Sequence, residues 1–321
     1  MTLAVPAGDV AEVEAEVGPG VAIIPLRLWP HGLAVAIELP FRLPRGAVAV
    51  TNNFTPWWGR SAVFIQDLLF VSNPEWFTFK ERLYFSLMPF TAPRARVVLA
   101  TSRDQAEVVR RVVRSARDVR AVGLGLSRDL LQARPRVPAI PLNMGSFILS
   151  VGRLNIRKNL ARACLAAVRS GRLSRMCPLV VVGVANGRTT EFPDEVQIAI
   201  ADGRVVLAGH IDTAELAWLY EHAGLFLFLS LGEGFGLPPV EALAFGARVL
   251  ASDIPVMREV LNGHASFVDP TSVDNIARAI ADAEIGTEDV MNRDLRRDYA
   301  RRSFSWPTTV AAIRAAAGGG G

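Results

Sequence analysis

Two glutamates, Glu233 and Glu241, lie eight positions apart within the glycine-rich residues 230–246. An apolar run at 225–229 precedes them and is typical of a buried strand, and the pair Pro238-Pro239 can open a helix. The segment therefore predicts a strand, a glycine loop and a helix, with Glu233 in the loop and Glu241 on the first helical turn. Free backbone N–H groups at such a turn bind anions. A carboxylate accepts hydrogen bonds from paired hydroxyl groups, so a phosphate attached to a sugar fits this chemistry.

A second polar loop, residues 152–159, reads Gly-Arg-Leu-Asn-Ile-Arg-Lys-Asn and follows a strand predicted at 147–151. Parallel strands bring their carboxyl ends to one edge of a sheet, so we expect Arg153 and Lys158 on the same edge as the two glutamates. Two cations beside a helix N-terminus can bind a diphosphate. Alone, either segment could be a solvated basic loop or a tight turn with surface glutamates; together they favour a binding site.

The composition describes a globular protein without disulfides or membrane spans. At 321 residues the chain exceeds the usual size of one core, so two domains are expected. The net charge is +4, and Cys164 and Cys177 are the two cysteines, which argues against a disulfide framework or a cysteine metal site. No apolar run is long enough to span a bilayer, and the N-terminus lacks the features of a signal peptide. We therefore expect a cytoplasmic protein.

The order of strand and helix signals predicts two α/β domains. Alternating signals from 147 onward indicate a doubly wound C-terminal domain, expected at 147–300, and strand signals near 3, 21, 48, 63 and 97 indicate an N-terminal domain at 1–130. Prolines at 135, 138 and 141 mark a linker at 131–146. A helix at 301–316 is expected to return to the N-terminal domain, and 317–321 to form a disordered tail.

The segments around Arg153, Lys158, Glu233 and Glu241 resemble those of the retaining glycosyltransferases of family 4, over roughly 47–312 and most strongly over 147–270. The resemblance implies an α/β GT-B fold, in which two Rossmann-like doubly wound domains face a cleft. It further implies transfer of a sugar from a nucleotide diphosphate donor to a glycan or lipid-linked acceptor, with retention of configuration. The pattern is most similar to mannosyltransferases of surface-polysaccharide pathways, which makes GDP-mannose the first donor expected; UDP- and dTDP-sugars remain open.

The resemblance also implies roles for individual residues. Glu233, Arg153 and Lys158 are the expected catalytic residues, because they would contact the donor sugar and stabilise its departing diphosphate. Glu241 would hold the ribose hydroxyls, and Ile211 would border the nucleobase. The expected donor-binding set is Gly152, Arg153, Lys158, Ile211, Glu233, Gly234, Phe235, Gly236, Leu237 and Glu241. No metal and no cofactor are expected.

Two departures from the family pattern concern the N-terminal domain. Relatives often carry a His-Asp pair near the reacting sugar, where this chain has Gln66 and Asp67, the expected acceptor-side residues. Gln66 can bind a hydroxyl but cannot take up a proton at neutral pH. Relatives also begin with a strand, a glycine loop and a helix that this chain lacks before the segment at Met1. The N-terminal domain is therefore expected to be truncated, with an in-frame extension upstream.

Several alternatives remain at this point. Gln66 and the short N-terminus favour a catalytically silent nucleotide-sugar-binding protein, or a non-catalytic partner subunit, as the competing function. A dehydrogenase is less favoured because no strand is followed by Gly-x-Gly-x-x-Gly. The aromatic-rich residues 54–90 and the arginines of 103–120 could contact a membrane surface peripherally, although a solvated basic face explains the arginines equally well. No nucleic-acid partner is expected.

Overall fold

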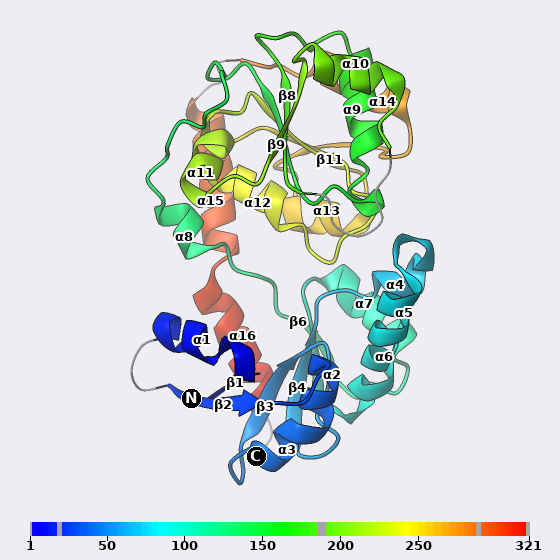
Figure 1. The fold of residues 1–321 in the computed structure, drawn as a ribbon, viewed down its shortest axis with the longest axis vertical. Coiled ribbons are helices and arrows are strands. Elements are labelled where there is room, and N and C mark those ends of the chain that lie inside the picture. Colours follow the sequence, from blue (N-terminus) through cyan, green and yellow to red (C-terminus); the bar gives the residue numbers. More distant parts are fainter. Residues whose placement is uncertain (1, 18–20, 185–190, 287–289, 319–321) are drawn as a thin grey trace. The chain divides into compact units, whose positions relative to one another are not determined.

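The computed structural model describes residues 2–17, 21–184, 191–286 and 290–318. It divides into two compact units. The first consists of Met1–Val71, Phe79–Val122 and Val310–Gly321, and the second of Ser72–Thr78 and Gly123–Thr309. From the sequence we expected the N-terminal domain to end at 130 and the C-terminal domain at 300. Figure 1 shows the course of the chain through both units.

The second unit contains a six-stranded parallel sheet in the order β12-β11-β10-β7-β8-β9. Numbered within the unit and read from β9 to β12, this order is 3-2-1-4-5-6, that of a dinucleotide-binding doubly wound sheet. The order reverses between β7 and β10, and ligands bind such sheets at the carboxyl ends of the strands at that point. The strands are β7 (Ile148–Val151), β8 (Leu179–Val182), β9 (Val205–Gly209), β10 (Leu225–Phe228), β11 (Val249–Ser252) and β12 (Ser266–Val268).

Helices cover both faces of this sheet, so its central strands are largely apolar, with the buried Ser150 of β7 as a polar exception. Leu149, Val180 and Phe226 point to one face and pack against α11, α12 and α13, whereas Ile148, Val181 and Leu227 point to the other and pack against α9, α10 and α14. The helices of the unit are α8 (Arg128–Gln132), α9 (Leu160–Arg169), α10 (Asp194–Ala201), α11 (Thr213–His222), α12 (Leu237–Ala244), α13 (Pro255–Leu261), α14 (Val273–Asp282) and α15 (Val290–Ser303), with short turns η3 (Pro74–Trp76) and η5 (Ile156–Lys158).

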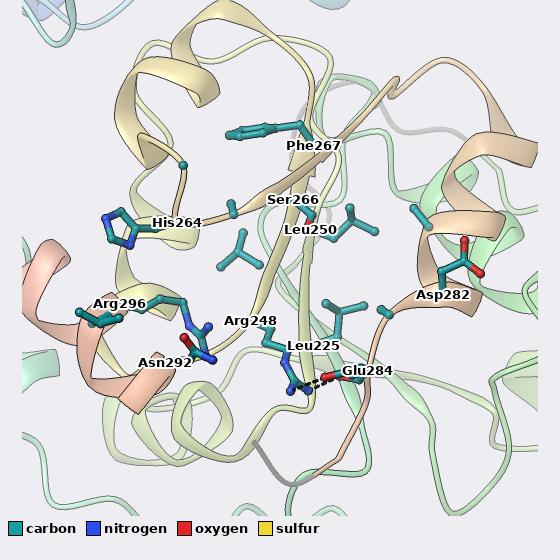
Figure 2. Close-up of a pocket in the computed structure, with 16 residues that line it drawn as sticks. Leu225, Arg248, Leu250, His264, Ser266, Phe267, Asp282, Glu284, Asn292 and Arg296 are labelled. Carbon is teal, nitrogen blue, oxygen red and sulfur yellow. Dashed lines mark hydrogen bonds and ion pairs between the residues drawn. The ribbon is translucent and has the colours of Figure 1, made fainter. Parts of the chain in front are cut away.

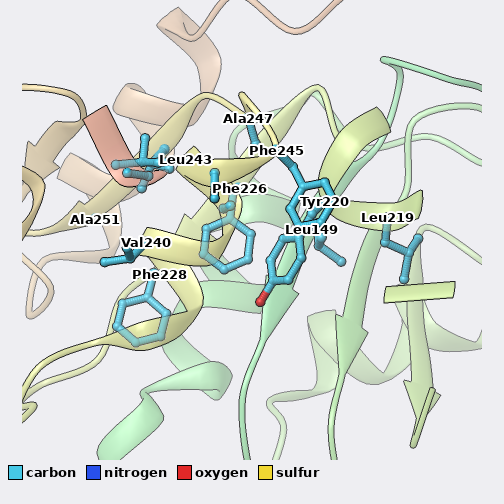
Figure 3. Packing of buried hydrophobic residues seen from close by; sticks show 14 of the residues in the cluster. Leu149, Leu219, Tyr220, Phe226, Phe228, Val240, Leu243, Phe245, Ala247 and Ala251 are labelled. Atoms are coloured by element: carbon cyan, nitrogen blue, oxygen red, sulfur yellow. The ribbon is translucent and has the colours of Figure 1, made fainter. Parts of the chain in front are cut away.

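Aromatic rings fill the first of these two cores (Figure 3). The ring of Phe226 lies 5.5 Å from that of Tyr220 and 6.3 Å from that of Phe228, measured between centroids. Tyr220 and Phe226 are fully buried. The rings thus hold α11 and α12 against β10, the strand that leads into the glycine loop.

The first unit holds two parallel sheets, one of four strands in the order β3-β4-β5-β6 and one of β1 and β2. The strands are β1 (Thr2–Pro6), β2 (Ala22–Leu26), β3 (Val48–Asn52), β4 (Arg60–Ile65), β5 (Val97–Ala100) and β6 (Val119–Ala121). The helices are η1 (Ala7–Asp9), α1 (Val10–Val17), α2 (His31–Leu33), the π-helix η2 (Ala34–Glu38), α3 (Leu39–Arg42), α4 (Leu69–Ser72), α5 (Phe79–Phe85), α6 (Leu87–Thr91), η4 (Ala92–Arg94) and α7 (Arg103–Val112).

The last helix, α16 (Trp306–Gly318), crosses the division between the units at residue 310. Its C-terminal residues Ile313, Ala316 and Ala317 pack against β4 and β5 of the four-stranded sheet. The tail expected at 317–321 is therefore wrong for Ala317 and Gly318, which are helical, and residues 319–321 lie outside the described residues. None of the described helices combines the length and apolar composition needed to cross a bilayer.

Replacement of Phe226 by alanine should lower the free energy of unfolding by about 3–5 kcal/mol, because it leaves a cavity beside rings that cannot close it. Denaturant unfolding followed by tryptophan fluorescence measures this loss. The exposed Ile198 of α10 supplies the control, for which Ile198→Ala should change the free energy by less than about 0.5 kcal/mol. Equal losses in the two variants would contradict the packing described for this core.

Candidate functional site

The site is built on the two strands that flank the reversal of sheet order. The loop after β7 contains Gly152, Arg153 and η5, and the loop after β10 contains Glu233. Backbone hydrogen bonds join them: the N–H of Leu231 donates to the carbonyl of Arg157 at 2.9 Å. The sequence analysis placed both loops on one edge of the sheet, and they meet there.

Asn159 locks the first loop in place. It is buried in the left-handed region, with φ of 58°, between η5 and α9. Its side-chain amide donates to the carbonyl of Leu229 at 3.0 Å and to that of Pro270 at 2.8 Å. One side chain thereby ties the loop after β7 to the ends of β10 and β12.

Glu233 is 7% exposed and lies between two cations. Its Oε1 accepts from Lys158 Nζ at 2.7 Å and its Oε2 from Arg157 Nη1 at 2.6 Å. Burial alone would raise the pKa of Glu233, but Lys158 and Arg157 outweigh it, so the pKa lies below its usual value and the carboxylate is ionised. Two cations around one carboxylate leave one positive charge in excess.

Lys158 is the buried member of this cluster. Its side chain runs along Gly152, where an added Cβ would lie 3.3 Å from Lys158 Cδ, and its ammonium lies 4.6 Å from the ring centroid of Phe228. Burial lowers the pKa of Lys158, and Glu233 opposes this shift. A desolvated ammonium on an aromatic face gains more from a bound anion than a solvated one does.

Arg157 is the residue that sequence reasoning missed. It belongs to the loop at 152–159, but Arg153 and Lys158 were the residues expected to bind the diphosphate. In the structure Arg157 pairs with Glu233 and also donates to the carbonyl of Gly232 at 3.1 Å. Arg153 is exposed, and its charge is near enough to help lower the pKa of Lys158. Residue spacing alone does not reveal which of the two arginines turns towards Glu233.

The glycine loop enters α12 through Gly236, which has φ of 91° and whose added Cβ would lie 2.3 Å from Met257. Phe235 is buried in the core, and Leu237 is partly buried against it. Among the described residues, no hydrogen bond occupies the N–H groups of Gly236 and Leu237. Pro238 and Pro239 carry no N–H, which reduces the anion-binding donors of this turn.

Glu241 lies on the second turn of α12, because the helix begins at Leu237; its expected place on the first turn is wrong. Its Oε2 accepts from the hydroxyl of the fully buried Tyr220 at 2.9 Å. Burial raises the pKa of Glu241, and the hydrogen bond from Tyr220 opposes this only in part. The carboxylate is thus held in one orientation, in surroundings that strengthen any hydrogen bond it accepts.

The remaining predicted residues lie elsewhere. Ile211 follows β9 and is partly buried against the aromatic core. Gln66 and Asp67 follow β4 in the first unit, where the carbonyl of Gln66 accepts from Thr101 at 3.0 Å and Asp67 accepts from the N–H of Leu69 at 3.2 Å.

A cavity of about 620 Å³ lies at the opposite ends of the strands, where β10, β11 and β12 begin (Figure 2). Arg248 pairs there with Glu284 at 3.2 Å, and His264 and Arg296 line the other side. His264 stacks on Tyr299 with centroids 4.1 Å apart. In doubly wound sheets ligands bind at the carboxyl ends of the strands, so this cavity is separate from the site around Glu233.

Comparison with known proteins agrees with this architecture. The sucrose-phosphate synthase of Thermosynechococcus elongatus superimposes with a TM-score of 0.64 at 19% identity, covering 92% of this chain and 82% of that one. The fold is therefore that of the GT-B glycosyltransferases. The model of the family "Glycosyl transferases group 1" matches residues 139–303, and the chain belongs to this family.

Curated relatives are mannosyltransferases of Escherichia coli. The chain is 27% identical over 282 residues to the serotype-specific mannosyltransferase WbdA, covering 82% of this chain and 34% of WbdA. It is 28% identical over 196 residues to O-antigen chain mannosyltransferase B, covering 58% of this chain and 51% of that relative. The chain thus spans between a third and a half of the length of these two relatives.

The raised pKa of the partly buried Glu241 predicts a pH-dependent difference in stability. With its pKa raised in the folded state, the stability it contributes is present below the unfolded value of 4.5 and is lost as pH rises through the folded pKa. Glu241→Gln, which can still accept from Tyr220, should therefore gain stability over the wild type at pH 7, and this gain should shrink towards pH 4.5.

Denaturant unfolding between pH 4.5 and 8 measures this difference. Glu107→Gln, at an exposed position of α7, is the matched control and should show no such trend. A gain that grows as pH falls would show that Glu241 is not held in a desolvating environment.

Proposed function

We propose that this chain transfers a sugar, with mannose from GDP-mannose the first expectation, from a nucleotide diphosphate donor to a glycan or lipid-linked acceptor. The observation that carries the proposal is the excess positive charge of Arg157 and Lys158 around the buried Glu233, at the reversal of strand order. A diphosphate is the anion this arrangement suits. The mannosyltransferase relatives support the sugar.

In the proposed reaction the bond between the sugar C1 and the diphosphate oxygen breaks, and a bond forms from the acceptor hydroxyl oxygen to C1 on the same face. The acceptor proton passes to the departing phosphate oxygen, so configuration is retained and the protein supplies no base. Lys158, Arg157 and Arg153 would stabilise the negative charge on the leaving diphosphate. This role needs neither a metal ion nor a cofactor.

Glu233 and Glu241 take separate roles in this proposal. Glu241, oriented by Tyr220, would accept hydrogen bonds from the ribose hydroxyls. Glu233 would fix the cations and offer its remaining acceptor positions to the donor sugar. Backbone groups from Gly234 to Leu237 would line the sugar and phosphate, Ile211 would border the base, and Gln66 and Asp67 would contact the acceptor.

The competing candidate is a nucleotide-sugar-binding protein without turnover. Gln66 favours it, because an amide at the end of β4 cannot accept a proton from an acceptor hydroxyl. The two candidates agree on binding and differ in whether the donor is consumed.

Lys158→Met should weaken GDP binding roughly ten- to a hundredfold, since one charge-assisted hydrogen bond contributes about 1.5–3 kcal/mol. Guanosine binding should change little, because guanosine has no phosphate. Calorimetric titration of both ligands measures this selectivity. Lys80→Met, at an exposed position of α5 in the first unit, is the matched control and should bind GDP like the wild type. Equal losses for GDP and guanosine would place Lys158 away from the diphosphate.

Incubation with GDP-mannose, UDP-glucose and a dTDP-sugar should release nucleoside diphosphate from one of them, in the presence and absence of a chelator. Proton NMR should show that the newly formed product has the donor's anomeric configuration.

Glu233→Gln should reduce the release of nucleoside diphosphate at least tenfold, because Lys158 and Arg157 lose the carboxylate that holds them in position. Tight nucleotide binding without release from any donor would favour the silent binding protein, and loss of release with chelator would refute metal independence.

A further inference from the structure

The first unit contains an apolar cavity of about 320 Å³ that the proposed transfer reaction does not use. It lies between the α2–η2 segment, the loop after β3 and α6, and its walls include Leu33, Ile37, Phe54, Trp57, Leu87 and Phe90. Thr91 also lines it, but its hydroxyl donates to the carbonyl of Leu87 at 2.9 Å. Such walls offer water few hydrogen-bond partners, so an apolar ligand suits this cavity better than water does.

A second cavity of about 430 Å³ adjoins the first and has the opposite character. It shares Trp57 with the apolar cavity, and Arg60, Arg94, Arg96 and Arg117 line it. No aspartate or glutamate is among the described residues that line it. Guanidinium groups gathered in one cavity can bind an anion such as phosphate through charge-assisted hydrogen bonds.

Arg94 stands at the junction of the two cavities. Its guanidinium carbon lies 4.0 Å from the ring centroid of Trp57 and 5.2 Å from that of Phe90, both of which line the apolar cavity. Its Nη1 donates to the carbonyl of Phe90 at 3.0 Å. An arginine fixed in this way over aromatic rings marks the boundary between an apolar chain and a charged headgroup.

Ser61 supplies an independent indication of a ligand in the basic cavity. It lines that cavity and is 1% exposed, yet its hydroxyl has no hydrogen-bond partner among the described residues. A buried hydroxyl without a partner is costly. A phosphate oxygen in the cavity would supply the missing partner.

We propose that the two cavities together take one anionic phospholipid of a bilayer, with an acyl chain in the apolar cavity and the phosphate among the four arginines. Trp58 and Phe41, both exposed and in edge-to-face contact 4.7 Å apart, suit the level of the headgroups. The lipid attaches the first unit to a membrane surface. This inference concerns residues of the first unit alone and does not rest on the donor site.

Flotation with lipid vesicles tests this proposal. One set contains phosphatidylcholine alone, and the other also contains roughly 30% phosphatidylglycerol, which gives the vesicle surface a negative charge that attracts arginines. The wild type should float with the anionic vesicles at low salt and less at high salt. The double variant Arg60→Gln/Arg117→Gln should bind the anionic vesicles about thirty-fold more weakly, because it lacks the usual contribution of two arginines to binding at an anionic surface. Arg45→Gln/Arg111→Gln removes equal charge from exposed positions that line neither cavity, and should bind like the wild type.

The apolar half is tested separately with Leu87→Gln, which places an amide in the apolar wall, against Leu83→Gln on the exposed face of α5. Leu87→Gln should weaken binding at low and high salt alike, whereas Leu83→Gln should not. Equal behaviour of the two arginine pairs, or of the two leucine variants, would overturn the proposal, as would a wild type that does not float. An unchanged free energy of unfolding in each variant shows that the fold is intact, and this control does not depend on the proposed transfer reaction.

Discussion

The carboxylate of Glu233, held between Lys158 and Arg157, is the interaction on which the rest of the site depends. Burying three charged groups is costly unless each has a partner, and here the one acid satisfies both bases. The cluster still carries an uncompensated positive charge. The ion pairs hold the three side chains in a fixed arrangement, which limits the reorganisation that binding of a further anion would require.

The sheet supplies the rigidity that this cluster needs. Both of its loops begin at central strands, whose side chains are buried on both faces of the sheet. At the ends of these strands the backbones approach closely: a Cβ added to Gly183, where φ is 142°, would lie 2.0 Å from the carbonyl oxygen of Gly152. Only glycine permits this approach. The position of Lys158 is therefore fixed by backbone packing as well as by its ion pair.

Much of this organisation could be predicted from the sequence, and the reasons are local. Continuous apolar runs such as 225–229 indicate strands that are buried on both faces. Alternation of strands with helices implies that the carboxyl ends of the strands share one edge of the sheet. From this shared edge we could predict that Lys158 and Glu233 lie on the same side of the sheet. Side-chain direction was harder to predict. Residue spacing does not show whether Arg153 or Arg157 turns towards Glu233, and the place of Glu241 depends on α12 beginning at Leu237. The paired cavities around Trp57 arise from segments that only tertiary packing brings together.

The amide of Asn159 has a consequence for motion within the second unit. Its side chain donates to the carbonyls of Leu229 and Pro270, which lie 70 and 111 positions further along the chain than Asn159. These hydrogen bonds join three separate segments. Such a link opposes independent fluctuation of any one segment. Local opening of one of these segments would therefore require breaking a buried hydrogen bond of Asn159, which raises the free energy of such an opening.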